Sequence, residues 1–133
     1  MLDSGIASFI IRGVSPSLDQ RFRRARPASL CISVITRGEL LLGVALKPGS
    51  QNLARVVDEF LSVVSCMPWE NTAASAYARC AADLQQAGQA IGTMDTLIAA
   101  HALALDAVLV THNLRHFSKV PGLRVEDWST EQP

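Results

Sequence analysis

Cysteines and long apolar runs are scarce in this 133-residue chain. Its three cysteines, Cys31, Cys66 and Cys80, are an odd number with no close pair. This spacing favours buried thiols in a reducing cytoplasm over disulfides or a zinc site. No basic N-terminal segment is followed by a long apolar stretch, so we expect no signal peptide and no membrane span.

Several motifs that carry chemistry are missing as well. There is no G-x-S-x-G sequence, no cysteine in a catalytic context and no glycine-rich loop of the kind that cradles phosphates. A domain of the phosphatase or response-regulator kind would need a nucleophilic aspartate at the end of a mid-chain strand, and none is found there. These absences argue against covalent catalysis and leave isolated carboxylates as the candidate reactive groups.

What the chain does contain is enough apolar material for one domain with a real core. Hydrophobic residues make up 49% of the chain and charged residues 18%, so disorder is not expected. We predict a single domain over residues 1–133, with a frayed tail at 129–133.

The net charge of zero hides an asymmetry between the two halves. Residues 1–55 hold eight Lys/Arg against three Asp/Glu, whereas residues 56–133 hold four against nine. The densest basic cluster comprises Arg21, Arg23, Arg24 and Arg26. It is suited equally to contacting phosphates and to forming a solvated helix end.

Hydrophobic periodicity predicts an alternation of strands and helices, which is typical of an open α/β sheet. Predicted strands lie at 1–2, 30–34, 66–67, 108–111 and 123–125, and predicted helices at 6–11, from 16 to near 27, from 36 to 46, 51–64, 71–87 and 93–105. The leucine-rich helix from residue 36 is predicted to be mostly buried. His101, on an apolar stripe, is predicted to be a hydrogen-bonded core residue rather than a ligand.

Three lone acids, Asp3, Glu39 and Asp95, stand at boundaries of these predicted elements. Carboxylates that converge at strand ends repel one another, and a bound divalent cation such as Mg²⁺ or Mn²⁺ removes that cost. His112 and His116 have the spacing of zinc ligands on a helix, but no third ligand stands nearby.

Each acid also has a purely structural interpretation. Asp3 can cap the helix that follows it, and Asp95 can favour a first helical turn through the helix dipole. Thr36 and Glu39 form a T-x-x-E capping box, in which Glu39 would bond back to the Thr36 amide. A carboxylate on a buried helix usually needs a partner, which favours a functional role for Glu39.

Four motifs, in order, resemble those of the PIN-domain nucleases and of their VapC toxin branch. They are Leu2-Asp3-Ser4-Gly5-Ile6; Ile32-Ser33-Val34-Ile35-Thr36 with Glu39-Leu40 and Gly43; Asp95 with Ile98-Ala99-Ala100 and Ala102; and Leu109-Val110-Thr111-His112-Asn113 with Arg115, Phe117, Val120-Pro121-Gly122-Leu123 and Trp128. The resemblance covers nearly the whole chain. It implies a three-layer α/β/α fold with a central parallel sheet.

The resemblance also implies a function and a site. It implies a Mg²⁺-dependent endoribonuclease, the toxin of a type II toxin–antitoxin pair, which cleaves a structured RNA such as a tRNA with a metal-activated water. The implied metal ligands are Asp3, Glu39 and Asp95, with Mn²⁺ as a substitute ion. Asn113 stands where the family often has a fourth acid, and Ser4 supports the first acid.

Basic residues and partners are assigned on the same resemblance. Arg12, Arg37 and Arg115 are the candidate RNA contacts. The implied partners are a VapB-like antitoxin, a second copy of the chain in a homodimer, and DNA only indirectly through the antitoxin. The chain also departs from the pattern, because Gly5 replaces the usual Asn and Gly38 a small Ala, and only one residue precedes Leu2.

Two hypotheses of different kinds therefore remain open from the sequence. The first is an active ribonuclease toxin. The second is a catalytically weak PIN scaffold that binds the antitoxin and helps it repress its own operon, a reading that Gly5 favours and the three retained acids oppose. Dependence of stability on a metal ion distinguishes them.

Overall fold

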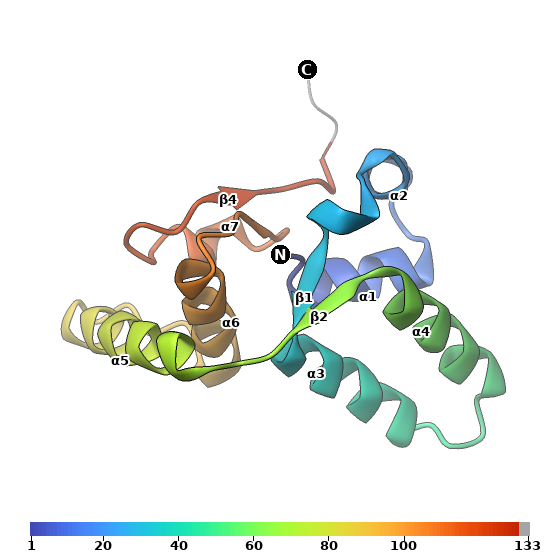
Figure 1. The fold of residues 1–133 in the computed structure, drawn as a ribbon, viewed down its shortest axis with the longest axis horizontal. Coiled ribbons are helices and arrows are strands. Elements are labelled where there is room, and N and C mark those ends of the chain that lie inside the picture. Colours follow the sequence, from blue (N-terminus) through green and yellow to red (C-terminus); the bar gives the residue numbers. More distant parts are fainter. Residues whose placement is uncertain (131–133) are drawn as a thin grey trace.

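The computed structural model describes residues 1–130 as helices on both sides of a short parallel sheet (Figure 1). The strands are β1 (Cys31–Ser33), β2 (Ser65–Met67), β3 (Leu109–Val110) and β4 (Val125–Glu126). The helices are α1 (Ser4–Arg12), α2 (Pro16–Arg24), α3 (Val34–Ala45), α4 (Gln51–Val63), α5 (Asn71–Gln86), α6 (Thr93–Ala104) and α7 (Leu114–Phe117), with a 3₁₀ turn, η1, at Pro27–Ser29.

The N-terminal residues join the two halves of the sheet. β1 pairs in parallel with β2, and β3 with β4. Leu2 lies between them and forms parallel bridges to Ile32 of β1 and Val110 of β3. The strand expected at residues 1–2 is thus very short but central, because the Leu2 amide donates to the Cys31 carbonyl at 2.9 Å and the Asp3 amide donates to the Val110 carbonyl at 3.0 Å.

Adjacent residues in the central segments point to opposite faces of the sheet and enter separate cores. Met1 and Leu109 pack with residues of α5, α6 and α7, whereas Leu2 and Val110 pack with residues of α1, α2 and α4. This alternation is the period of two that a strand imposes. It produces the three-layer α/β/α arrangement and explains why apolar residues follow one another in these segments.

Serine side chains set the starts of three helices. Ser15, Ser33 and Ser50 each accept a hydrogen bond from a backbone amide two or three residues further on, at the starts of α2, α3 and α4. Because Ser33 caps α3, that helix begins at Val34, two residues before the predicted Thr36 start, and β1 is correspondingly shorter than the predicted 30–34 strand. The chain leaves α1 through Gly13, whose φ of +63° is the left-handed conformation that glycine tolerates.

The prediction that the leucine-rich α3 helix is mostly buried is wrong. Only Thr36 of this helix is buried, while Leu42 and Leu46 are 57% and 72% exposed. α3 packs against neighbouring elements mainly through its first turns and extends away from the sheet at the lower side of Figure 1. Leu40 packs against the core, whereas Leu41 and Leu42 of α3, and Leu46 just after it, form an exposed apolar surface.

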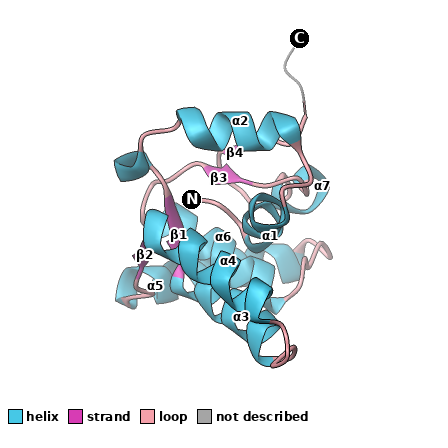
Figure 2. Ribbon diagram, turned by 90° about the vertical axis from the view of Figure 1, so that its right-hand side faces the viewer, coloured by secondary structure: helices cyan, strands magenta, loops and turns pink. Residues whose placement is uncertain are grey.

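α2 lies at the end of the molecule opposite α3 in both views (Figures 1 and 2). The segment after β4 returns to this helix, where the Ser17 hydroxyl donates to the carbonyls of Trp128 and Thr130 at 3.3 and 3.2 Å. Ser129 and Thr130 of the predicted frayed tail are thus hydrogen-bonded, and residues 131–133 of that tail lie outside the described residues. No helix within residues 1–130 is long and apolar enough to cross a membrane.

Candidate active site

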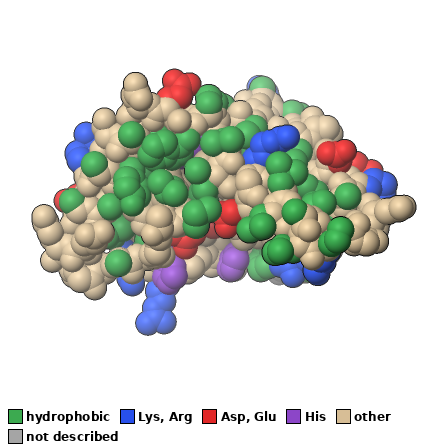
Figure 3. Space-filling model, turned by 90° about the horizontal axis from the view of Figure 1, so that it is seen from below, with side chains coloured by type: hydrophobic (Ala, Val, Ile, Leu, Met, Phe, Trp, Pro, Cys, Tyr) green, Lys and Arg blue, Asp and Glu red, His purple; other side chains and the backbone are tan. Residues whose placement is uncertain are grey.

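The four predicted site residues lie at one edge of the sheet. Two of them directly follow parallel segments, and two lie in the first or second turn of a helix. Asp3 follows the Leu2 bridge and Asn113 follows β3, while Glu39 lies in the second turn of α3 and Asp95 in the first turn of α6. The face of the molecule seen from below has acidic side chains near its middle, histidines beside them and apolar areas on either side (Figure 3). The fold therefore brings the acids from three separate elements toward one region, as expected for the carboxyl edge of an open α/β sheet.

Asp3 is both a helix cap and a buried carboxylate. Its Oδ1 accepts a hydrogen bond from the Ile6 amide at 2.8 Å, and the residue is only 5% exposed. Burial raises the pKa of Asp3, and the charge of Asp95 raises it further, while Thr111, the Ile6 amide and His112 act in the opposite direction. The structural interpretation of Asp3 is confirmed, but a cap does not need such burial beside another acid, so capping alone does not account for this residue.

Glu39 is held from α1 and not from its own helix. The Ser4 hydroxyl donates to Glu39 Oε1 at 2.6 Å and lies 3.0 Å from the hydroxyl of the buried Thr36. The predicted capping box between Thr36 and Glu39 is therefore wrong, because Thr36 is already inside α3 and its amide needs no side-chain partner at a helix start. The Ser4 contact links α1 to α3 and joins Glu39 to the residue that follows Asp3 in the sequence.

Asp95 is more accessible than Asp3. Its side chain is 38% exposed, and Oδ2 lies 3.6 Å from Nδ1 of His116 on α7. As the acid in the first turn of α6 it also has the favourable dipole position expected from the sequence. A partly exposed carboxylate near the buried Asp3 leaves a side from which an ion or a phosphate can approach.

Asn113 lies at the junction between β3 and α7. Its amide donates to the hydroxyl of Thr111 at 2.9 Å, and its side chain makes no capping hydrogen bond to α7. His101 is 1% exposed, and its Nδ1 lies 2.7 Å from the Ser33 hydroxyl, which confirms the predicted core role. Burial lowers the pKa of His101, so its ring is neutral at physiological pH.

His112 is the site residue that the sequence reasoning did not place. The zinc-ligand spacing of His112 and His116 does not apply, because His112 precedes α7 and the two histidines do not share a helix. Its ring instead stacks on Phe9 of α1, with centroids 4.5 Å apart. The sequence feature that points to His112 is Gly5, because the first motif has no side chain at this position.

The acidic group is suited in its chemistry to a hard divalent cation. Within residues 1–130, no three His, Cys, Asp or Glu side chains already stand close enough to hold one ion between them. The donors are nevertheless carboxylate oxygens, which Mg²⁺ and Mn²⁺ prefer. Asp3 also carries the specific cost that a cation would remove, since burial and the charge of Asp95 both disfavour its ionised form.

The candidate RNA-binding arginines are all exposed but lie in different places. Arg12 ends α1 with its guanidinium 5.3 Å from the Phe9 ring centroid, Arg37 lies in the first turn of α3, and Arg115 lies on α7. Arg12 is therefore next to the residue on which His112 stacks, which brings one of the three near the acidic group.

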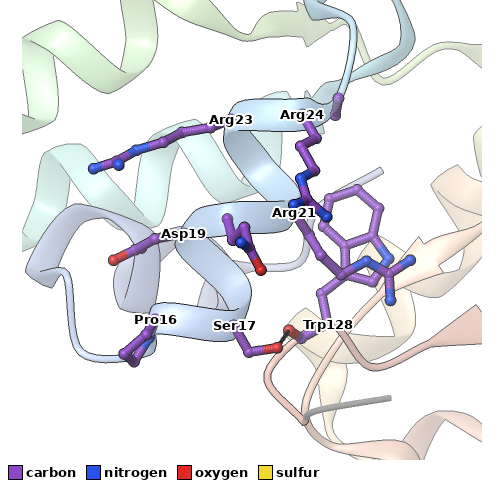
Figure 4. Close-up of a pocket in the computed structure, with 9 residues that line it drawn as sticks. Pro16, Ser17, Asp19, Arg21, Arg23, Arg24 and Trp128 are labelled. Atoms are coloured by element: carbon purple, nitrogen blue, oxygen red, sulfur yellow. Dashed lines mark hydrogen bonds between the residues drawn. The ribbon is translucent and has the colours of Figure 1, made fainter. Parts of the chain in front are cut away.

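The other basic cluster lines a shallow hollow on α2, away from α3. The hollow has a volume of about 1180 Å³ and is lined by α2 residues and Trp128 (Figure 4). Arg21 lies over the Trp128 ring at 4.8 Å and 3.8 Å from Glu126, while Arg23 and Arg24 are exposed. Arg21 thus packs on Trp128. For this one arginine of the four, the contacts favour a structural role over phosphate binding.

Comparison with known proteins agrees with this fold. The PIN-domain family matches residues 1–123. The chain is 33% identical to the tRNA(fMet)-specific endonuclease VapC of Shigella flexneri over 129 residues, which is 97% of each chain. Solved structures of DNA-bound VapBC from Salmonella typhimurium (34% identity, TM-score 0.90, 96% of each chain) and of promoter-bound VapBC2 from Rickettsia felis (30%, TM-score 0.89, 96% and 97%) share its fold.

The fold and the acidic edge of the sheet thus define a PIN domain, and the chain belongs to the PIN-domain family. Within that family it belongs with the VapC-type ribonucleases, which it matches over nearly its whole length. Nucleases of the PIN family depend in general on divalent metal ions.

Proposed function

We propose that this chain is a Mg²⁺-dependent endoribonuclease and the toxin of a toxin–antitoxin pair, with Mn²⁺ as a substitute ion. The observation that carries the proposal is the convergence of Asp3, Glu39 and Asp95 at one sheet edge, with Asp3 buried beside the charge of Asp95. A divalent cation bound there supplies an activated water and neutralises charge on the scissile phosphate.

The side chains of the chain itself provide the positioning. The Ile6 amide fixes Asp3, and the Ser4 hydroxyl fixes Glu39, so that two acids are held by hydrogen bonds from the same helix. Asp95 is open to solvent on the remaining side. Such fixed carboxylates supply preorganised negative charge where the ion must sit, at little further entropic cost on binding. We assign Asn113 a supporting role at the edge of the same group.

The substrate that we propose is a tRNA, with the initiator tRNA as the first candidate, because relatives at 33% and 34% identity are named tRNA(fMet)-specific endonucleases. Arg12, Arg37 and Arg115 are the proposed contacts to the RNA backbone. All three are exposed, and Arg12 stands near the acidic group through Phe9.

The partner that we propose is a VapB-like antitoxin in the cytoplasm, with DNA bound only through that antitoxin. The support is that similar chains were solved as VapBC complexes, two of them on DNA. We also propose a homodimer, because the exposed leucines of α3, among them Leu42 and Leu46, form an apolar surface that a second chain would cover.

The test is cleavage by the purified, antitoxin-free chain of initiator tRNA and of elongator methionine tRNA, with Mg²⁺ or with EDTA. The Asp95→Asn variant is the matched control, because it changes one charge on an accessible side chain and leaves the fold intact. We expect discrete fragments from the initiator tRNA that disappear with EDTA and with Asp95→Asn. Absence of both cleavage and Mn²⁺ binding by calorimetry would favour the catalytically weak scaffold.

A further inference from the structure

The ring of His112 occupies the space directly above Gly5, beside Asp3. A Cβ atom added to Gly5 would lie 2.8 Å from Cε1 of His112, which is closer than real Cβ atoms approach other atoms, and 3.1 Å from Nδ1 of the same ring, which is a tight contact. The same Cβ would lie 3.6 Å from Asp3 Oδ1. One place beside the Asp3 carboxylate is therefore filled by His112, and a side chain at position 5 requires that ring to shift.

Phe9 holds the His112 ring in that place. The two rings stack with centroids 4.5 Å apart and an angle of 24° between their planes, and Phe9 follows Gly5 by one turn of α1. The ring of His112 thus lies along the first two turns of the helix that Asp3 caps. His112 itself is exposed, so the contact is not a consequence of burial in the core.

We propose that His112 is a positioning residue for the acidic site, whose imidazole replaces the missing side chain at position 5 and keeps the Asp3 carboxylate in place. This explains why the glycine is compatible with an intact site, since the polar group beside Asp3 comes from the segment after β3 and not from α1. The consequence for catalysis rests on the proposed ribonuclease function, whereas the exclusion between position 5 and His112 does not.

The exclusion is tested by melting midpoints in a metal-free buffer. Gly5→Ala should lower the midpoint in the otherwise unchanged chain, because the methyl group meets the imidazole. In a His112→Ala background the same change should raise the midpoint, because alanine favours a helix more than glycine does. Gly43→Ala on α3 is the control, since a Cβ at Gly43 meets nothing within 4 Å, and it should raise the midpoint in both backgrounds.

An increase of the midpoint by Gly5→Ala in both backgrounds would overturn the proposed contact. It would mean that the imidazole does not stand where a side chain at position 5 must go. The comparison requires no RNA and no metal ion, so it remains decisive even if the chain proves to cleave nothing.

The positioning role is tested by Mn²⁺ affinity and by cleavage kinetics. His112→Ala should weaken Mn²⁺ binding and lower kcat by about tenfold or more, with little change in KM, because a small displacement of a site group costs rate and not substrate binding. Gly5→Asn alone should be impaired by collision with His112. The double variant Gly5→Asn with His112→Ala should regain most of both quantities, since it returns a polar side chain to the same place from α1.

Two outcomes contradict the role. The first is a His112→Ala chain with unchanged Mn²⁺ affinity. The second is a double variant that regains the melting midpoint but not the Mn²⁺ affinity. That result is expected if His112 contributes only to the stability of the fold. Failure of the unchanged chain to cleave any tRNA, with the Mn²⁺ effects as expected, would refute tRNA as the proposed substrate and leave the positioning role standing.

Discussion

Replacement of Ser4 by alanine should weaken the link between α1 and Glu39. The Ser4 hydroxyl donates to Glu39 Oε1 at 2.6 Å, and a hydrogen bond to a carboxylate contributes about 1.5–3 kcal/mol when it is buried. Both residues are only half-buried, so the expected loss lies below that range, at about 1 kcal/mol. For a chain of this length it corresponds to a fall of roughly 3–5 °C in the melting midpoint.

Ser8→Ala is the matched control for this substitution. Ser8 lies one turn further along α1 and is also half-buried, and its hydroxyl makes no hydrogen bond among the described residues. Ser8→Ala removes a hydroxyl from the same helix without removing a side-chain contact, so the difference between the two variants reports the loss of the Ser4 contacts with Glu39 and Thr36. Calorimetric melting in EDTA measures that difference without any contribution from a bound ion.

The same change should lower activity through the position of Glu39. A loss of about 1 kcal/mol of site organisation corresponds to roughly a fivefold fall in rate, measured as kcat on initiator tRNA, with a parallel loss of Mn²⁺ affinity. In a double-mutant cycle, Ser4→Ala and Glu39→Gln should show a coupling of about 1 kcal/mol. The reasoning is refuted if Ser4→Ala melts and cleaves as Ser8→Ala does, or if the two site variants are additive.

Three further predictions concern charge and exposed surface. Burial raises the pKa of Asp3 above its ordinary 3.8, so the folded chain binds more protons than the unfolded chain and loses stability as the pH rises above about 3.8. Asp3→Asn should therefore raise the metal-free melting midpoint at pH 7. The same change should abolish cleavage and stabilisation by Mn²⁺. Burial lowers the pKa of His101 below 6.5, so stability should fall as pH drops below about 6.5, and urea unfolding of His101→Gln should show less of this loss. Leu42→Glu and Leu46→Glu should shift the chain from dimer to monomer in sedimentation, and an unchanged dimer would exclude α3 as the interface.

The local features of the fold were predictable because they depend on neighbours in sequence. The strand around Leu109 and Val110 is apolar on successive residues because each face of the sheet is covered, and this pattern is visible in the sequence. Asp3 was recognisable as a helix cap, and His101 as a hydrogen-bonded core residue. The approximate bounds of most helices followed from their apolar stripes.

The burial of α3 could not be predicted in this way, for a physical reason. A run of leucines indicates burial, but it does not say whether the chain's own core or another surface covers it. Leu42 and Leu46 are 57% and 72% exposed, so only a second molecule could bury them. The capping box at Thr36 failed similarly, because Ser33 was an equally good cap three residues earlier and tertiary packing of Thr36 decided between them.

The sequence by itself therefore determined which residues are acidic, apolar or turn-forming, and the order of strands and helices that carry them. Only the tertiary structure decided that Leu2 lies between Ile32 and Val110, that Ser4 holds Glu39, and that His112 stands over Gly5. Each of these contacts joins segments about thirty or more residues apart. The periodicity of apolar residues indicates only local conformation, whereas these long-range contacts depend on how the helices and strands pack. The candidate site is built from such contacts.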